Sequence, residues 1–103
     1  MKFSATGKRS LLSDSITEYA SNRFVTALDR FNAYVSRVRV RIEDLNGPRG
    51  GIDKRCQARI SFISGASMAI EATANDAYAA IDWAAQRAKL RVSRRVDKLK
   101  GNL

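Results

Sequence analysis

The residues of this sequence with the clearest chemical potential are cations near the end of the chain. The segment "RAKLRVSRRVDKLK" (residues 87–100) holds seven basic residues and one acid, and residues 87–103 carry +6 of the formal net charge of +9. Guanidinium and ammonium groups form charge-assisted hydrogen bonds with phosphate oxygens, so the segment predicts contact with a polyanion. The candidate phosphate-binding residues are Arg87, Lys89, Arg91, Arg94, Arg95, Lys98 and Lys100.

The hydrophobic pattern of the same segment predicts a helix that packs on the rest of the protein. At about 100° per residue, one apolar stripe continues through the basic segment, which favours a docked helix over a loose tail. The stripe consists of Ile81, Ala84, Ala85, Ala88, Val92, Val96 and Leu99. A neighbouring stripe carries four cations at steps of four, three and four residues, a line about 16 Å long at 1.5 Å per residue. They are Arg87, Arg91, Arg94 and Lys98. We place Arg95 at the edge of the apolar face, and Lys89 and Lys100 on its other side.

Four explanations of this basic stripe are open. A merely solvated helix face usually mixes charge signs, whereas this one has only Asp97 among its cations. A membrane-surface helix is disfavoured, because its apolar face is built largely of Ala and Val and is needed for the core. Duplex DNA is possible, but the sequence has no helix-turn-helix pattern and no zinc module. Structured RNA, held through its phosphates, fits best.

A second group of cations alternates with apolar residues and is expected on one face of a β-sheet. In the segment 34–45, Val38, Val40 and Ile42 face one way, and the arginines between them face the other. The segment 52–62 alternates in the same manner. The outward cations of the two segments are Arg37, Arg39, Arg41, Arg55 and Arg59. Because no RNP-like motif or outward aromatic residue accompanies them, we expect contact with the RNA backbone rather than base reading.

The elements that must position these cations follow from the periodicity and from capping residues such as Ser13. The expected elements are a strand at 1–6, a helix at 14–31, strands at 34–45, 52–62 and 67–74, and a helix from a cap at Asn75 or Asp76 to residue 99. Each helix has one apolar stripe and each strand one apolar face. We therefore predict one α+β domain over residues 1–103, a two-layer β-α-β-β-β-α sandwich with both helices on one face of a four-stranded sheet. Tyr78 and Trp83, on the first turns of the last helix, are expected to pack.

The sequence offers little for catalysis or metal binding. It has no histidine, so it has neither a Ser-His pair nor an imidazole base. The glycine-rich "NGPRGG" (residues 46–51) lacks the spacing of a phosphate loop, and we expect a hairpin turn there. Cys56 is the only cysteine, so no internal disulfide or thiolate cluster can form, and we expect this thiol to be buried. We predict a protein without enzymatic activity, metal or cofactor.

The lengths of the apolar runs in the sequence indicate where in the cell the protein is expected. The beginning "MKFSATGKRSLL" (residues 1–12) has no apolar run that resembles a signal peptide, and nowhere do about 18 apolar residues run together. A cytoplasmic protein that does not enter a membrane is expected.

Two long segments resemble a known family. They are "SATGKRSLLSDSITEYASNRF" (residues 4–24) and "IEATANDAYAAIDWAAQRAKLRVSRRVDKLK" (residues 70–100), and with the β-α-β-β-β-α order they resemble the hibernation-promoting factors and ribosome-associated inhibitors, also called Y proteins. The most specific piece is "DAYAAID" (residues 76–82) followed by a basic amphipathic helix. The resemblance implies a fold related to double-stranded-RNA-binding domains. It also implies a monomer that binds the small ribosomal subunit and its rRNA in the channel for mRNA and tRNA, and so silences and protects idle ribosomes.

The resemblance also assigns roles by position. Arg87 and Arg94 stand where the family has basic residues, Lys98 and Lys100 extend this basic end, and Asp76 and Tyr78 match the family's helix opening. Leu90 occupies a usually basic place, with Arg91 one step along.

The remaining differences from the family lie in a loop and at the end of the chain. The hairpin "EDLNGPRGGIDKRC" (residues 43–56) is longer than in compact members, and the chain is expected to be a short form without the C-terminal domain through which long members pair ribosomes. Two other functions are open: a general double-stranded-RNA-binding module, and a small regulator that acts by contacting a protein.

Overall fold

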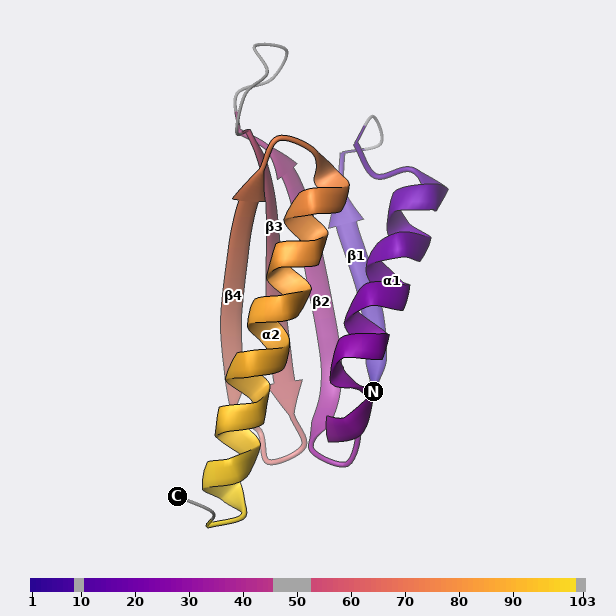
Figure 1. Cartoon of the computed structure of the whole chain (residues 1–103). Coiled ribbons are helices and arrows are strands. Elements are labelled where there is room, and N and C mark those ends of the chain that lie inside the picture. Colours follow the sequence, from indigo (N-terminus) through magenta and orange to yellow (C-terminus); the bar gives the residue numbers. More distant parts are fainter. Residues whose placement is uncertain (9–10, 46–52, 102–103) are drawn as a thin grey trace.

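A computed structural model of the protein describes residues 1–8, 11–45 and 53–101 (Figure 1). Its elements are β1 (Lys2–Gly7), α1 (Asp14–Leu28), the 3-10 helix η1 (Asp29–Phe31), β2 (Val35–Asp44), β3 (Lys54–Phe62), β4 (Ser67–Ala74) and α2 (Ala77–Leu99). The predicted β-α-β-β-β-α order is confirmed. The turn expected at residues 46–51, and position 52, where the third strand was expected to begin, lie outside the described residues.

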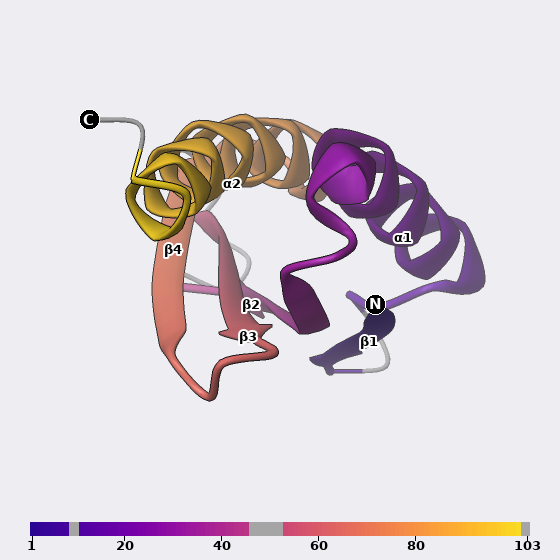
Figure 2. The same cartoon turned by 90° about the horizontal axis from the view of Figure 1, so that it is seen from below.

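The four strands form one mixed sheet in the order β1-β2-β3-β4. β1 pairs with β2 in parallel, whereas β2 with β3 and β3 with β4 are antiparallel. Figure 2 shows both helices on the same side of this sheet, so its other side is an open face. The predicted two-layer α+β architecture is therefore confirmed, and β1 and β4 are the two edge strands.

Side-chain caps define where the two helices begin. The Ser13 hydroxyl accepts a hydrogen bond from the backbone N–H of Ile16 at 3.1 Å, and the Asp76 carboxylate accepts one from the N–H of Ala79 at 2.9 Å. Each cap satisfies a backbone donor that has no partner within the helix. The first helix is shorter than predicted, because its last residues tighten into the 3-10 helix η1, a common way for a helix to end.

The core lies between the helices and the inner face of the sheet. Strands β2 and β3 turn their apolar faces toward the helices, as their alternation predicted. Six of their residues are at most 1% exposed: Val38, Val40, Ile42, Cys56, Ala58 and Ile60. Burial raises the pKa of the Cys56 thiol to about 12, so this cysteine is a packed side chain rather than a nucleophile. Helix α2 faces the sheet mainly with small residues, namely Ala77, Ala80, Ala84, Ala85 and Ala88.

The apolar stripe of α2 ends earlier than predicted. Val96 is buried, but Leu99 is 51% exposed, so its expected packing on the sheet is wrong. Leu99 is the last residue of α2, and the last turn of this helix extends past the end of the sheet (Figure 1).

The close packing of α2 on the sheet can be tested by enlarging one of the buried side chains of this helix. Replacing Ala88, which is 0% exposed, by Leu inserts a bulky side chain where the structure leaves no room. We expect the free energy of unfolding, measured by urea titration with circular dichroism, to fall by about 1–3 kcal/mol. The matched control is Gln86→Leu, which places the same side chain on the exposed face of α2 and should change stability by less than about 0.5 kcal/mol. Equal stability of the two variants would contradict the packing described above.

Candidate nucleic-acid interface

The predicted line of cations lies on the solvent side of α2. Arg87, Arg91, Arg94 and Lys98 are all exposed. Within the described part of the chain, the side chains of Arg91, Arg94 and Lys98 make no hydrogen bond or ion pair with the protein. Arg87 differs, because its Nη1 donates a hydrogen bond to the backbone carbonyl of Glu71 on β4 at 2.6 Å. This helix therefore holds several guanidinium and ammonium groups whose hydrogen-bonding capacity is left for a ligand.

The other predicted cations of α2 have different surroundings. Arg95 is half-buried, and its Cζ lies 5.7 Å from the centre of the Phe62 ring. The Nζ atom of Lys100 lies 5.8 Å from the centre of the Tyr34 ring. Both contacts fall in the range of a cation–π interaction, which fixes the side chain without neutralising its charge. Lys89 is exposed.

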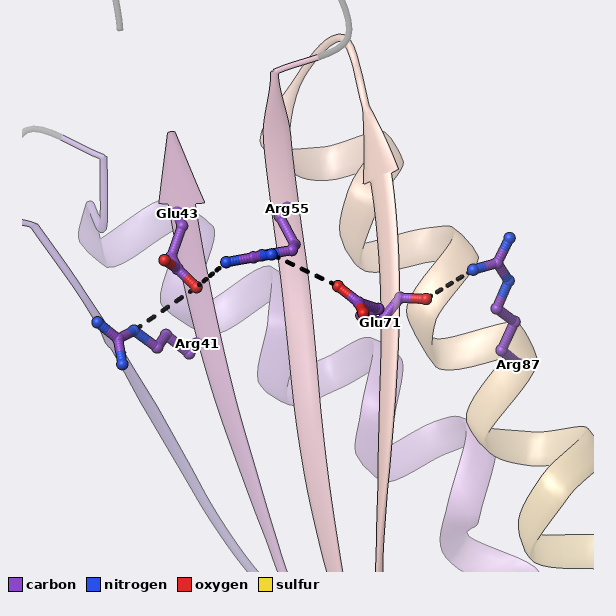
Figure 3. A network of polar contacts seen from close by, with 5 residues as sticks. All are labelled: Arg41, Glu43, Arg55, Glu71 and Arg87. Carbon is purple, nitrogen blue, oxygen red and sulfur yellow. Dashed lines mark hydrogen bonds and ion pairs between the residues drawn. The ribbon is translucent and has the colours of Figure 1, made fainter. Parts of the chain in front are cut away.

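One part of the open sheet face balances its charges. The Arg55 guanidinium lies 3.1 Å from the Glu43 carboxylate and 3.7 Å from the Glu71 carboxylate, and Arg41 lies 3.7 Å from Glu43 (Figure 3). With Arg87 on the Glu71 carbonyl, this network crosses β2, β3 and β4 and reaches α2. We call these four residues, Arg41, Glu43, Arg55 and Glu71, the compensated half of the face. Their carboxylates compete with any phosphate for the two arginines.

Among the described residues, the charged side chains on the rest of the open face are all cations. In the strand register Arg39 lies directly opposite Arg59, and Lys2 lies directly opposite Arg37. Like charges at such positions destabilise a sheet. None of the four makes an ion pair within the described residues, and Arg59 reaches only the Ser67 hydroxyl, at 3.5 Å. We call these four residues the uncompensated half, and its unfavourable arrangement is typical of a binding surface.

The cations of the sheet and those of α2 meet at the edge strand β4. A shallow hollow on the open face is lined by Arg39, Arg59 and residues 69–71, among others. A groove between β4 and α2 is lined by residues 69–71 and by Arg87, Leu90, Arg91 and Arg94. The two hollows share the same three residues of β4, so the two predicted basic fields form one surface that bends around this strand. We call it the β4-edge surface, and it consists of Arg39, Arg59, Arg87, Arg91 and Arg94.

Some features near the basic residues were not predicted from the sequence. Lys2 was not among the predicted site residues, because a single outward lysine gives no signal until its register with Arg37 is known. Trp83 was expected to pack, but it is 55% exposed, so that prediction is wrong. Tyr78 does pack edge-on against the Tyr19 ring, with centroids 4.9 Å apart, although 41% of it is exposed.

On the side of α2 that faces α1, an acidic side chain binds residues of α1. The Asp82 carboxylate accepts hydrogen bonds from the Tyr19 hydroxyl at 2.6 Å and from Arg23 Nε at 2.8 Å. The hydrogen bond to Asp82 raises the pKa of Tyr19. These contacts join the two helices, so the unpaired cations of α2 lie on its opposite side, toward β4.

Two further properties of the described residues concern other kinds of site. Residues 1–8, 11–45 and 53–101 contain no group of three or more carboxylate, thiol or imidazole side chains that could hold a metal ion. Over the same ranges, neither helix combines the length and the apolar composition needed to cross a membrane.

Comparison with known proteins gives one family and several similar structures. The family model described as "Sigma 54 modulation protein / S30EA ribosomal protein" matches residues 3–100. No curated protein sequence matches the chain. A ribosomal subunit interface protein from Coxiella burnetii has a similar structure, with a TM-score of 0.77 and 16% identity over 92% of this chain and 97% of that one. The N-terminal domain of Thermus thermophilus Protein Y has a TM-score of 0.69 and 25% identity over 90% and 93%. The first likeness, at its low identity, supports the fold alone.

The difference between paired and unpaired arginines can be measured through the salt dependence of RNA binding. Replacing Arg91 and Arg94 by Gln removes two unpaired cations, whereas replacing Arg41 and Arg55 by Gln removes two that already face carboxylates. Both variants have the same formal charge. We expect the first to reduce the slope of log affinity against log salt by about 0.7–0.9 for each phosphate that is no longer neutralised, and the second to reduce it less.

The measurement is a filter-binding titration with a structured RNA at several salt concentrations. Thermal unfolding of both variants serves as the control for folding. Equal slopes for the two variants would mean that the ion pairs of the compensated half do not withhold its arginines from phosphate.

Proposed function

The chain belongs to the sigma 54 modulation protein / S30EA ribosomal protein family, and we propose that it is a ribosome hibernation factor. It binds the small ribosomal subunit in the channel for mRNA and tRNA, holds rRNA phosphates through its cations, and inhibits translation. The family consists of non-enzymatic ribosome-modulating proteins, which agrees with a role that requires no catalytic step and no cofactor. Binding to ribosomes implies a cytoplasmic protein.

The observation that supports this proposal most strongly is the β4-edge surface. It presents guanidinium groups on two sides of one strand, and Arg91 and Arg94 have no protein partner among the described residues. Folded rRNA brings phosphates from different strands close together, and a surface bent around β4 can contact phosphates on both of its sides. Contacts of this kind position a protein without reading sequence.

The inhibition follows from occupancy of space. A folded domain held at several phosphates excludes mRNA and tRNA from the volume that it fills, so neither ligand can bind until the domain leaves. The rigid packing of α2 on the sheet aids this, because preformed elements give up little side-chain and backbone freedom when they bind. The protein acts as a monomer in this mechanism.

Competition on purified small subunits tests the proposal. The protein is pelleted with small subunits at a fixed salt concentration near 0.15 M, since phosphate contacts weaken steeply with salt. We expect tRNA together with a short mRNA analogue to release the protein in proportion to their own occupancy. The Arg91→Gln, Arg94→Gln double variant should pellet less than the wild type under the same conditions.

An unrelated RNA duplex, added at the same phosphate concentration, is the control for general charge effects. It should release much less protein than tRNA and mRNA do. Equal release by the duplex would identify a general double-stranded-RNA-binding module. Binding that is indifferent to tRNA and mRNA would refute the occupancy mechanism, and no binding to subunits would favour a regulator that contacts a protein.

A further inference from the structure

An exposed tryptophan stands in line with the cations of α2. Trp83 is followed by Arg87, Leu90 and Arg94 at steps of four, three and four residues, which places the four side chains within about 60° of the helix circumference. Trp83 is 55% exposed, and its ring makes no aromatic or cation–π contact within the described residues. A large apolar ring at this position adds nothing to the core.

We propose that Trp83 stacks on an unpaired RNA base while Arg87 and Arg94 hold phosphates of the same strand. This inference rests on the proposed function and adds to it a feature of the ligand: the bound rRNA offers a base that is not in a duplex. Arg87 lies one helical turn from Trp83, about 6 Å along the axis. A base and the nearest phosphates of its own strand lie within such a distance of each other. Arg94 lies about 16 Å from Trp83 along the axis, so it holds the phosphate of a nucleotide further along the strand.

The chemistry of the neighbours favours RNA over an apolar protein partner. Arg87 and Arg94 share the sector with Trp83, and Arg91 lies beside it. The two acids closest to these residues already face other cations, Asp82 with Arg23 and Glu71 with Arg55. A flat π-system among guanidinium groups is the arrangement that proteins use to bind single-stranded nucleic acids, because every base has a face to stack and every nucleotide a phosphate. Arg87 is held in place by its bond to the Glu71 carbonyl, so its position relative to the ring is fixed.

Intrinsic fluorescence gives a direct test, because Trp83 is the only tryptophan of the protein. The wild type is titrated at low salt with a single-stranded RNA oligonucleotide and, separately, with inorganic polyphosphate. Both ligands bind the cations, but only the oligonucleotide has bases. We expect the oligonucleotide to quench the emission of Trp83 and polyphosphate to leave it nearly unchanged. The same weak response to both ligands would overturn the proposal.

Affinity for small subunits gives the second test. Trp83→Ala should weaken binding about 5- to 150-fold, the effect of removing one stacked base, while Trp83→Phe should retain most of the affinity. Trp83→Leu should bind as weakly as the alanine variant. The salt slope should stay that of the wild type in all three, since every cation is retained. The matched control is Ile63→Ala, because Ile63 is 66% exposed and lies outside α2.

The outcomes separate this inference from the proposed function. If the wild type binds subunits and Trp83→Ala binds equally well, stacking is refuted and the hibernation role stands. Full rescue by leucine would also refute stacking, because an apolar contact with a protein would then explain the affinity. If the wild type does not bind subunits, the proposed function fails, and the oligonucleotide titration still decides whether Trp83 stacks on bases.

Discussion

The packing of α2 on the sheet is the interaction on which the candidate interface depends. Its buried stripe consists mainly of small side chains, among them Ala84 and Ala88, which let the helix axis approach the strands closely. Because side chains leave a helix at fixed angles, burial of this stripe determines where Arg91 and Arg94 point. The cations therefore need no ordering of backbone when a ligand binds, and only their own rotamers are restricted.

The register of the strands has the corresponding role on the open face. It places Arg55 between two carboxylates and sets Arg39 directly opposite Arg59, although the same alternation of residues puts all three arginines on the open face. Strand β4 connects this face with α2, and the bond from Arg87 to the Glu71 carbonyl satisfies one acceptor of β4 with a side chain instead of a further strand. This acceptor of the edge strand is therefore not open to pairing with a further strand.

How much the sequence predicted depends on how local each feature is. The elements, the helix cap at Ser13 and the inward faces of the strands follow from patterns a few residues long, and they were predicted. The cap of the second helix was left open between Asn75 and Asp76, and the structure assigns it to Asp76. The pairing of Arg55 with Glu43 and Glu71 depends on register across two strand pairs, which no short pattern contains. The exposure of Trp83 could have been predicted, because its helical phase places it away from the apolar stripe. It was missed because the prediction followed the general tendency of aromatic residues to pack.

The division of the open face has a consequence for stability. A chain of 103 residues buries a modest core, so repulsion between cations such as Arg39 and Arg59 weighs on a small margin. The ion pairs of the compensated half limit this cost to the uncompensated half. A polyanion that binds the folded but not the unfolded protein offsets the remaining repulsion. The free energy of unfolding then rises with the logarithm of the ratio of polyanion concentration to its dissociation constant. Under the proposed function, the same cations that weaken the free protein thus couple its folding to RNA binding.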